Sequence, residues 1–368
     1  MIDFEQIIRP TLLIDKSRAF RNLKKLTDKA QKHQLEFRPH FKTHQSEEVG
    51  KWFREFGVTK ITVSSVQMAK YFAGLGWQDI TIAFPVNIRA IKEINQLAKK
   101  VQLHILVESL EVLDFLDAHL ESKLGLFIKI DTGYHRTGVA ANNIRFIDQL
   151  LKRLEAVQQA NFMGFLVHSG HSYQCRSKEA IRSVHHSSQQ QLKALRRRYL
   201  DIYPNMIISI GDTPTCSVAD NFSAIDEIRA GNFVYYDLMQ WNIGACDLDE
   251  IAVALACPIV AKHADRREIV IYGGGVHFSK ERGTHPLLKT TYYGILVQWT
   301  SDSWKVINTN NYLKSVSQEH GVLRVEEDTF DQLKIGDVIG ILPIHSCMTA
   351  DLLRHTKDVL YISRDIQY

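Results

Sequence analysis

Two short segments contain residue types that carry covalent and metal chemistry. Residues 38–44 read RPHFKTH and place Lys42 at the end of an apolar run, between two histidines. Residues 343–347 read PIHSC and place His345 and Cys347 two positions apart. A lysine amine forms imines with carbonyl groups, and imidazole with thiolate is a ligand pair that favours zinc. Together the segments suggest an amine that forms a Schiff base and a metal ion that handles a leaving hydroxyl.

Each segment also has an ordinary interpretation. Burial disfavours a charged ammonium, so a lysine at the inner end of a strand favours the neutral amine that imine chemistry needs. The alternative for Lys42 is a surface lysine whose stem covers apolar neighbours. On an extended strand, His345 and Cys347 would face the same way; the alternative is a buried cysteine beside an exposed histidine. Only two ligands are visible locally, so a metal here would need water or substrate to complete its coordination.

Three further polar segments are candidates for binding. In residues 131–138 (DTGYHRTG), Arg136 is a donor for a phenolate or carboxylate, or an ordinary loop arginine. In residues 168–173 (HSGHSY), His168 could stack on a flat cofactor and Tyr173 could donate a hydrogen bond, whereas a lone histidine is more often a core residue. Residues 211–215 (GDTPT) and 231–232 (GN) are the third candidate, a phosphate site or plain turns.

The elements that must position these residues alternate along the chain. Short β-branched runs are separated by amphipathic stretches such as 46–56, 66–75, 88–100 and 178–199. The expected strands are 35–43, 60–65, 79–84, 103–109, 125–132, 161–169, 205–213 and 227–235. Eight strands separated by helices over this length predict an α/β fold with a closed (β/α)8 TIM-type barrel. An open doubly wound sheet is the alternative, because periodicity does not reveal closure.

The candidate residues cluster where the expected strands end. A barrel brings the C-terminal ends of all its strands to one face, where such enzymes keep their chemistry. Sites that are remote in the sequence would therefore converge on one cavity. This convergence is the strongest evidence in the residues themselves that the chain is an enzyme.

After about residue 256 the pattern becomes β-rich, with expected strands at 258–262, 267–272, 292–299, 321–325 and 338–342. We therefore expect a barrel domain over residues 1–255 and a smaller all-β domain over residues 256–368. The opening run at 11–15 precedes the barrel, so residues 1–15 are a candidate to pair with the second domain.

Composition limits the function classes. Lys+Arg 45 against Asp+Glu 41 gives a net charge of +4, too small for this length to indicate a nucleic-acid or membrane-surface partner. No apolar run approaches the roughly 18 residues of a membrane span, and the first residues do not resemble a signal peptide. Five scattered cysteines without a CxxC pair indicate a reduced, cytoplasmic protein.

Taken in order, these segments resemble the fold-type III pyridoxal-phosphate enzymes. They are similar to alanine racemase and, more closely, to the D-serine dehydratase / D-threonine aldolase family, over essentially the whole chain. The resemblance implies that Lys42 is the Schiff-base residue and that Arg136 binds the phenolic oxygen of the cofactor. It also implies that His168 and Tyr173 contact the cofactor ring and that Thr213, Gly231 and Asn232 bind its phosphate. The metal ligands that it implies are His345 and Cys347. Residues 317–321 (SQEHG) resemble a further family segment.

The metal pair separates the branches of the resembled family. Alanine racemases lack it, and within the family the second ligand is a cysteine in the dehydratases and typically an aspartate in the aldolases. Cys347, together with the HSGHSY segment, therefore favours the dehydratase branch. The chain departs from the pattern at residues 272–277 (YGGGVH), where many relatives have an aspartate-bearing segment, which bears on the choice of substrate.

The resemblance implies a lyase that uses pyridoxal phosphate and zinc, or another divalent metal such as Mn²⁺, on a β-hydroxy D-amino acid. Lys42 would remove the α-proton and the metal would polarise the departing hydroxyl, giving a 2-oxo acid and ammonia. The alternatives are aldolase-type cleavage to glycine and an aldehyde with His44 or His168 as the base, racemization, and a non-catalytic pyridoxal-phosphate carrier. A homodimer is expected by analogy.

Overall fold

The computed structural model describes residues 3–354 and 358–362. The chain divides into two compact units, Lys25–Gly231 and Met1–Lys24 with Asn232–Tyr368. Helix α1 (Lys16–Lys32) crosses the boundary between them. Within the described ranges, no helix combines the length and the apolar character needed to cross a membrane.

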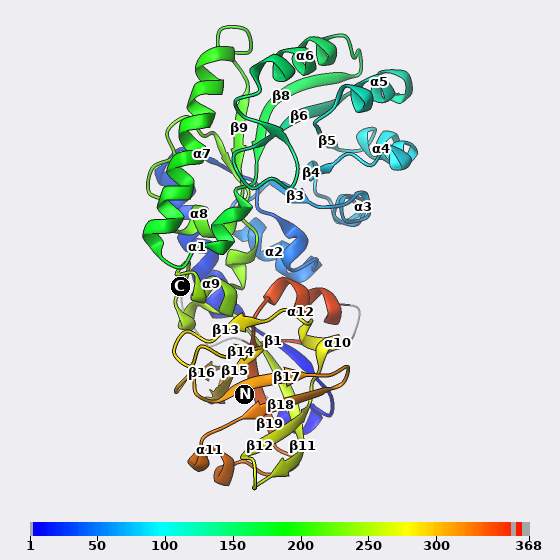
Figure 1. Ribbon diagram of the computed structural model, residues 1–368. Coiled ribbons are helices and arrows are strands. Elements are labelled where there is room, and N and C mark those ends of the chain that lie inside the picture. The colour runs from blue at the N-terminus through cyan, green and yellow to red at the C-terminus, as the bar shows by residue number, and fades with distance from the viewer. Residues whose placement is uncertain (1–2, 355–357, 363–368) are drawn as a thin grey trace. The chain divides into compact units, whose positions relative to one another are not determined.

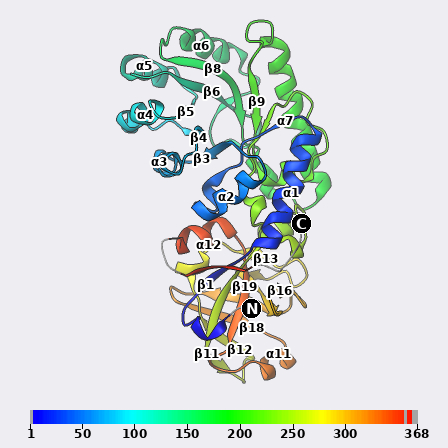
Figure 2. The same ribbon diagram turned by 180° about the vertical axis from the view of Figure 1, so that it is seen from behind.

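The unit Lys25–Gly231 is a ring of parallel strands, which pair in the order β2-β10-β9-β8-β6-β5-β4-β3. A parallel bridge between His40 and Thr62 joins the two ends of this order, and the Thr62 N–H donates to the Pro39 carbonyl at 2.9 Å. The prediction of a (β/α)8 barrel is therefore confirmed, and the open sheet is excluded (Figures 1 and 2). The strands are β2 (Glu36–Phe37), β3 (Lys60–Val63), β4 (Asp79–Pro85), β5 (Gln102–Val107), β6 (Leu124–Asp131), β8 (Ala160–Val167), β9 (Ile207–Ile210) and β10 (Glu227–Ile228).

Helices surround this ring, and four of them begin at serine caps. Ser46, Ser65, Ser109 and Ser177 each accept a hydrogen bond from the N–H three residues on, which satisfies a donor that the first helical turn leaves unpaired. The capped helices bury one face; α2, for example, buries Val49, Trp52 and Phe53 at helical spacing. The helices are α2 (Glu47–Glu55), α3 (Val66–Gly74), α4 (Ile91–Ala98), α5 (Leu110–His119), α6 (Ile144–Glu155), α7 (Lys178–Tyr199) and α8 (Thr213–Val218).

Two of the expected barrel strands are much shorter than predicted. The run at 35–43 forms only β2, and a 3₁₀ turn, η2 (Phe41–Thr43), follows it because Pro39 has no N–H for a ladder and His40 caps the turn. The run at 227–235 forms only β10, and a second turn, η5 (Asn232–Val234), begins after Gly231. Both corrections move candidate residues from strands into the loops that follow them.

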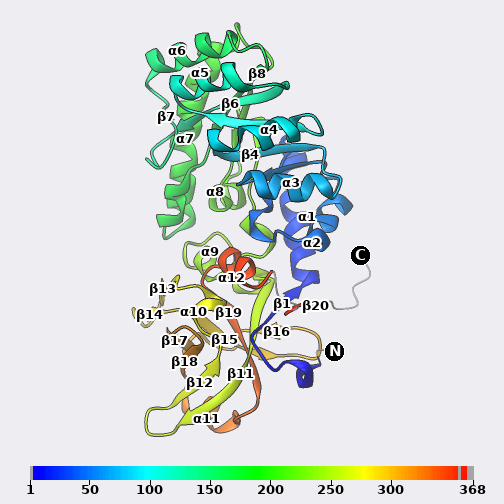
Figure 3. The ribbon, with the colours of Figure 1, turned by 90° about the vertical axis from the view of Figure 1, so that its right-hand side faces the viewer.

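The other unit is a mostly antiparallel sheet in the order β12-β18-β17-β15-β19-β11-β1-β20, in which β16 pairs with β15 and only β1 and β20 run parallel among the described strands. Because β12 also pairs with β11, six of these strands form a closed ring of their own, and β1 extends it by pairing with β11 and β20 (Figure 3). The strands are β1 (Thr11–Asp15), β11 (Val253–His263), β12 (Glu268–Tyr272), β15 (Gly294–Trp299), β16 (Trp304–Lys305), β17 (Tyr312–Val316), β18 (His320–Arg324), β19 (Val338–Pro343) and β20 (Val359–Ile362).

Short elements complete both units. The barrel unit adds β7 (Val139–Ala140), η3 (Ile88–Ala90) and η4 (Gly170–Gln174). The β-rich unit adds η1 (Phe4–Gln6), η6 (Leu248–Glu250), β13 (Gly283–Thr284), β14 (Thr291–Tyr292), α9 (Leu238–Asn242), α10 (Gly275–Phe278), α11 (Glu327–Gln332) and α12 (Ser346–Leu353). The helices between the strands of this second unit are all short, as the sequence predicted.

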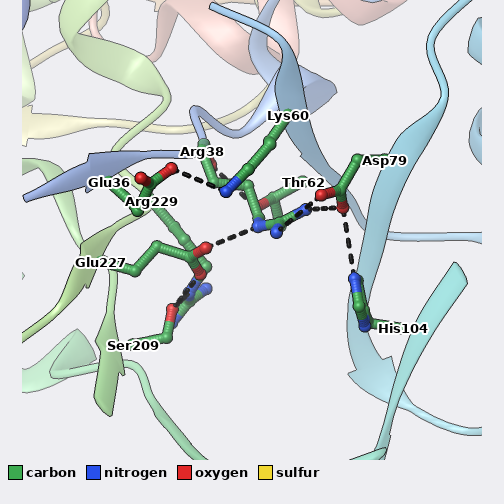
Figure 4. Close-up of polar contacts among 9 residues, drawn as sticks. All are labelled: Glu36, Arg38, Lys60, Thr62, Asp79, His104, Ser209, Glu227 and Arg229. Atoms are coloured by element: carbon green, nitrogen blue, oxygen red, sulfur yellow. Dashed lines mark hydrogen bonds and ion pairs between the residues drawn. The ribbon is translucent and has the colours of Figure 1, made fainter. Parts of the chain in front are cut away.

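A buried ion network joins strands inside the barrel (Figure 4). The Arg38 guanidinium donates to Glu227 at 2.7 Å and also pairs with Asp79, so it spans β10 and β4. Arg38 and Glu227 are 3% and 1% exposed, so removal of the Arg38 charge would leave Glu227 buried without this ion-pair partner. Although burial raises it, hydrogen bonds from His104 and Arg38 lower the pKa of Asp79 to about 2.

We expect Arg38→Leu to lower the free energy of unfolding by about 3–5 kcal/mol, because it leaves the buried Glu227 and the half-buried Asp79 without this cation. Urea titration followed by circular dichroism measures the change. The control is Lys60→Leu, which breaks the more exposed Lys60–Glu36 pair (2.7 Å) and should cost less than about 1 kcal/mol. Equal effects of the two substitutions would contradict a structural role for the buried network.

Candidate active site

Lys42 lies in the turn η2, directly after the short strand β2. Phe41 anchors this turn in the core. Its ring is fully buried and packs on Phe53 and Trp77, with ring centroids 4.9 Å and 5.0 Å apart. The His40 Nδ1 accepts the Lys42 N–H at 3.4 Å. The Lys42 side chain itself is exposed. The burial that the sequence predicted for this lysine is therefore absent, because the residue lies in a turn and not inside a strand.

Arg136 lies in a loop that one carboxylate organises. Asp131, the last residue of β6, accepts the backbone N–H groups of Gly133, Tyr134 and His135 at 2.9–3.1 Å. Although partial burial raises it, these hydrogen bonds lower the pKa of Asp131. The exposed Arg136 guanidinium lies 5.0 Å from the centre of the Tyr134 ring. This cation–π contact limits where the guanidinium can point.

His168 follows β8, and its Nδ1 bonds to the carbonyl of Gly211 after β9. Burial lowers the pKa of His168 well below its ordinary value, and the cations Lys42 and Arg136 act in the same direction. The ring is therefore neutral at physiological pH. Tyr134 meets it edge-on at 5.8 Å, and Tyr173 lies 6.3 Å away between centroids.

Thr213 is the first residue of the short helix α8, and its surroundings are already polar and occupied. The Tyr173 hydroxyl accepts the Thr213 N–H at 3.4 Å. Asp212 caps the helix by accepting the Thr215 N–H at 2.8 Å and its hydroxyl at 2.7 Å. The free N–H groups that the sequence predicted here are therefore fewer than expected, because Asp212 takes one of them.

Gly231 lies after β10, where the backbone passes close to the turn that carries Lys42. A Cβ at this position would lie 2.5 Å from the carbonyl oxygen of His40, which is closer than van der Waals contact permits. Only glycine fits without displacement of one backbone by the other. Gly231 is thus a packing requirement of the Lys42 turn.

The barrel unit therefore brings six candidate residues to the C-terminal ends of its strands: Lys42, Arg136, His168, Tyr173, Thr213 and Gly231. Lys42 and Arg136 both act electrostatically on His168, as expected for groups around one site. Of the two histidines considered as bases, His44 is buried, stacks on Phe53 at 5.5 Å and accepts the Ser46 N–H. His44 is therefore a core residue, and its burial lowers its pKa to about 3.

Asn232, His345 and Cys347 belong to the β-rich unit. Strand β19 ends at Pro343, His345 directly precedes helix α12, and Cys347 lies in the first turn of that helix. The expectation that both side chains project from one strand was therefore wrong, because the chain turns into a helix between them. The side chains still meet. Although burial lowers it, hydrogen bonds to Cys347 and Glu281 raise the pKa of His345 to about 11.

The segment that departs from the family pattern packs against the segment that follows it. The N–H of Gly273 donates to Glu319 at 2.9 Å, and the N–H of Gly275 donates to Ser317 at 2.7 Å. A Cβ on Gly274 would collide with the Gln318 carbonyl. The three consecutive glycines allow this close approach, and helix α10 then packs on α12, where the Thr349 hydroxyl donates to Phe278 at 3.3 Å (Figure 3).

Several residues of these sites escaped the sequence reasoning. Tyr134 and Asp212 support Arg136 and Thr213, and Asp237 and Glu281 surround the metal pair. Lys129 lies buried within β6; burial, with the neighbouring Arg229 and Arg136, lowers its pKa to about 7. Lys129 left a signal, because a lysine interrupts the otherwise apolar run LFIKI. The others lie in ordinary polar loops and left none.

The donors present fit both groups that the sequence implies. An exposed amine, a fixed guanidinium, a neutral imidazole and a phenol suit an aromatic aldehyde with an acidic hydroxyl. Imidazole and thiol, side by side, suit a divalent metal. In the described residues no group of three or more His, Cys, Asp or Glu side chains forms a complete cage, so such a site would be open. The His345 Nδ1 is buried and lies 3.5 Å from the Glu281 carboxylate, which holds the imidazole beside Cys347.

Fold and site thus define a (β/α)8 barrel joined to an antiparallel sheet unit, with a lysine turn in the first and a histidine–cysteine pair in the second. Residues 14–238 match the family model described as alanine racemase, N-terminal domain. The chain belongs to this family. Residues 252–357 match the model described as putative serine dehydratase domain.

Curated relatives span the same two parts. The chain is 29% identical to D-serine dehydratase of Dictyostelium discoideum, over 99% of this chain and 96% of that protein. It is 28% identical to D-threo-3-hydroxyaspartate dehydratase of Delftia sp., over 92% and 91%. It is 23% identical to 3-hydroxy-D-aspartate aldolase of Paracoccus denitrificans, over 95% and 88%.

The solved structure of the Delftia sp. dehydratase superimposes with a TM-score of 0.90 at 25% identity, over 98% of this chain and 96% of that one. A variant of that enzyme has been solved in a metal-free form, and it matches with a TM-score of 0.87 at 26% identity, over 96% and 94%. The whole two-unit chain, and not the barrel alone, therefore has a structural counterpart.

We expect Gly231→Ala to destabilise the protein by about 1–3 kcal/mol, because the added methyl group overpacks two backbones that cannot easily separate. Thermal and urea unfolding measure the change. The control is Gly74→Ala in helix α3, where a Cβ meets nothing within 4 Å and alanine should stabilise by about 0.5–1 kcal/mol. A neutral Gly231→Ala variant would show that the close approach to His40 is unimportant.

Proposed function

We propose that this protein is a pyridoxal-phosphate-dependent lyase that removes water from a β-hydroxy D-amino acid, releasing a 2-oxo acid and ammonia. D-serine is the expected substrate. The observation that carries the proposal is that the chain combines an exposed lysine at the end of a barrel strand with a His345–Cys347 pair in the β-rich unit. The two tandem family models and the dehydratase relatives support it.

Pyridoxal phosphate is the cofactor expected for the alanine racemase fold family, and when bound it would supply an electron sink for the α-carbon of the substrate. Lys42 would hold it through its accessible amine and, once released by the substrate, take the α-proton. Arg136, steadied by Tyr134, would donate to the phenolic oxygen. His168 and Tyr173 would flank the ring, and the neutral imidazole adds no charge to it. Thr213, Gly231 and the backbone N–H of Asn232 are the proposed phosphate positions, since the Asn232 side chain is engaged elsewhere.

A divalent cation on His345 and Cys347, Zn²⁺ or Mn²⁺, would supply a Lewis acid for the departing β-hydroxyl. The carboxylates Glu281 and Asp237 give these ligands an anionic environment, which favours a dication. Racemization involves no departing hydroxyl, so such a cation would have no chemical role in it. A non-catalytic carrier would need neither the second unit nor the pair.

Aldolase-type cleavage is the remaining alternative, supported by the aldolase relative at 23% identity. It needs a base for the hydroxyl proton. His168 is the better placed of the two histidines first considered, because His44 lies in the core. Cys347, the ligand type of the dehydratase branch, favours loss of water.

Metal- and cofactor-replete protein should convert D-serine to an oxo acid and ammonia, and D-threonine should yield little aldehyde. Oxo acid is measured by coupled reduction and aldehyde by derivatisation, each before and after chelation. Chelation should abolish oxo-acid formation and readded Zn²⁺ or Mn²⁺ should restore it. Aldehyde without oxo acid would establish the aldolase alternative, and activity that survives chelation would remove the metal from the reaction.

Lys42→Ala should lose activity by at least about 10²–10⁴-fold, because no other group replaces the proton-transferring amine. Borohydride reduction followed by peptide mass spectrometry should place the cofactor on Lys42 in the wild type. Lys51→Ala is the control, since Lys51 is 60% exposed on helix α2, where it pairs with Glu47. A label on Lys129, the buried lysine of the barrel, would contradict the assignment.

We further propose a cytoplasmic homodimer. All five cysteines lie in the described residues, and none forms a disulfide there, which suits a reducing compartment. Light scattering of the purified protein tests the dimer. A monomer with full activity would refute it.

A further inference from the structure

The side chain of Asn232 contacts the metal pair, although its sequence position suggested a phosphate contact. Its Nδ2 lies 2.8 Å from the Asp237 carboxylate, 2.9 Å from the Ser346 hydroxyl and 3.3 Å from the Cys347 sulfur. All four residues belong to the β-rich unit. Asn232 is only 7% exposed, so these contacts are not exchanged for water. The amide donors are consumed here and are not available to a phosphate.

Asp237 fixes the orientation of this amide. One carboxylate oxygen accepts the Gln240 N–H at 2.9 Å and caps α9, while the other accepts the Ser346 N–H at 3.0 Å and the Asn232 amide. A flipped amide would place its oxygen against that carboxylate. The carboxylate takes one amide hydrogen, which leaves the other for the Ser346 oxygen and the Cys347 sulfur.

One unsatisfied atom marks the same place as incomplete. The Asn232 Oδ1 is buried with no hydrogen-bond partner in the described residues. Buried polar atoms without partners are rare in folded proteins and call for a missing group. A hydrated cation next to Cys347 would bring water protons to this acceptor.

We propose that Asn232 is a positioning residue of the metal site, whose amide orients the Cys347 sulfur toward the cation while Asp237 and Ser346 hold the amide in place. This inference rests on the metal site of the proposed function. A hydrogen bond to a ligating sulfur restricts its side-chain rotamer and tunes the metal–sulfur bond, and loss of such an outer partner typically lowers metal affinity by about 10–100-fold.

The test uses the full-length protein, stripped of metal, with Zn²⁺ titrated against a chromogenic chelator and Co²⁺ binding followed by its thiolate charge-transfer absorption. Asn232→Leu should weaken Zn²⁺ binding by about 10–100-fold and alter the Co²⁺ band. Asn232→Ser keeps a polar group for folding, but its hydroxyl is too short to reach the sulfur, so it should weaken binding similarly. Circular dichroism confirms that each variant is folded.

The matched control is Asn311→Leu. Asn311 is 6% exposed in the same unit and bonds to Thr329 and the Glu326 N–H, away from the metal pair, so Zn²⁺ binding should be unchanged. Cys347→Ser should lose binding. If it does while both Asn232 variants bind Zn²⁺ like the wild type, the inference is overturned and the metal site stands. If Cys347→Ser itself binds like the wild type, the metal site of the proposed function fails, and the inference with it.

Discussion

The barrel depends on one buried ion pair at the place where its hydrogen-bond ladder is thinnest. Strands β2 and β10 pair through only two residues each, and β2 reaches β3 through the single His40–Thr62 bridge. Arg38 crosses this gap by pairing with Glu227 on β10 and Asp79 on β4. Such a pair need not add net stability, since both charges must be dehydrated. It does specify which strands meet, and Lys42 follows four residues later.

A second carboxylate plays the same organising part in the β-rich unit. Asp237 caps α9 with one oxygen and binds the start of α12 with the other. It therefore ties the segment after the barrel to the segment that carries His345 and Cys347. Both candidate centres are thus held by buried, fully engaged acids, Glu227 in one unit and Asp237 in the other. A rigid support of this kind is what a preorganised site requires.

The sequence was sufficient for the barrel, because eight β-branched runs and the amphipathic spacers between them indicate the same alternation. Helix α7 lies at the predicted residues, 178–199. Strand ends were less predictable. The runs at 35–43 and 227–235 are apolar enough for strands, but the loss of a ladder donor at Pro39 and the close approach at Gly231 end them early. The proline is visible in the sequence, whereas the approach of Gly231 to His40 is a contact between segments almost 200 residues apart, which a single-sequence pattern does not contain.

The same limit explains the site. Lys42, His345 and Cys347 stood out by residue type, whereas Tyr134, Asp237 and Glu281 matter only through their neighbours. Gly231 and Asn232 show the difference at adjacent positions. The sequence suggested one shared phosphate-binding role for both residues. In the structure, Gly231 is required by its close approach to the His40 carbonyl, and the side-chain amide of Asn232 contacts the Cys347 sulfur. The two adjacent residues therefore have separate roles: Gly231 allows the lysine turn to pack closely, and Asn232 contacts the metal pair. Because these roles differ, substitutions at the two positions separate the packing of the cofactor turn from the ordering of the metal ligand.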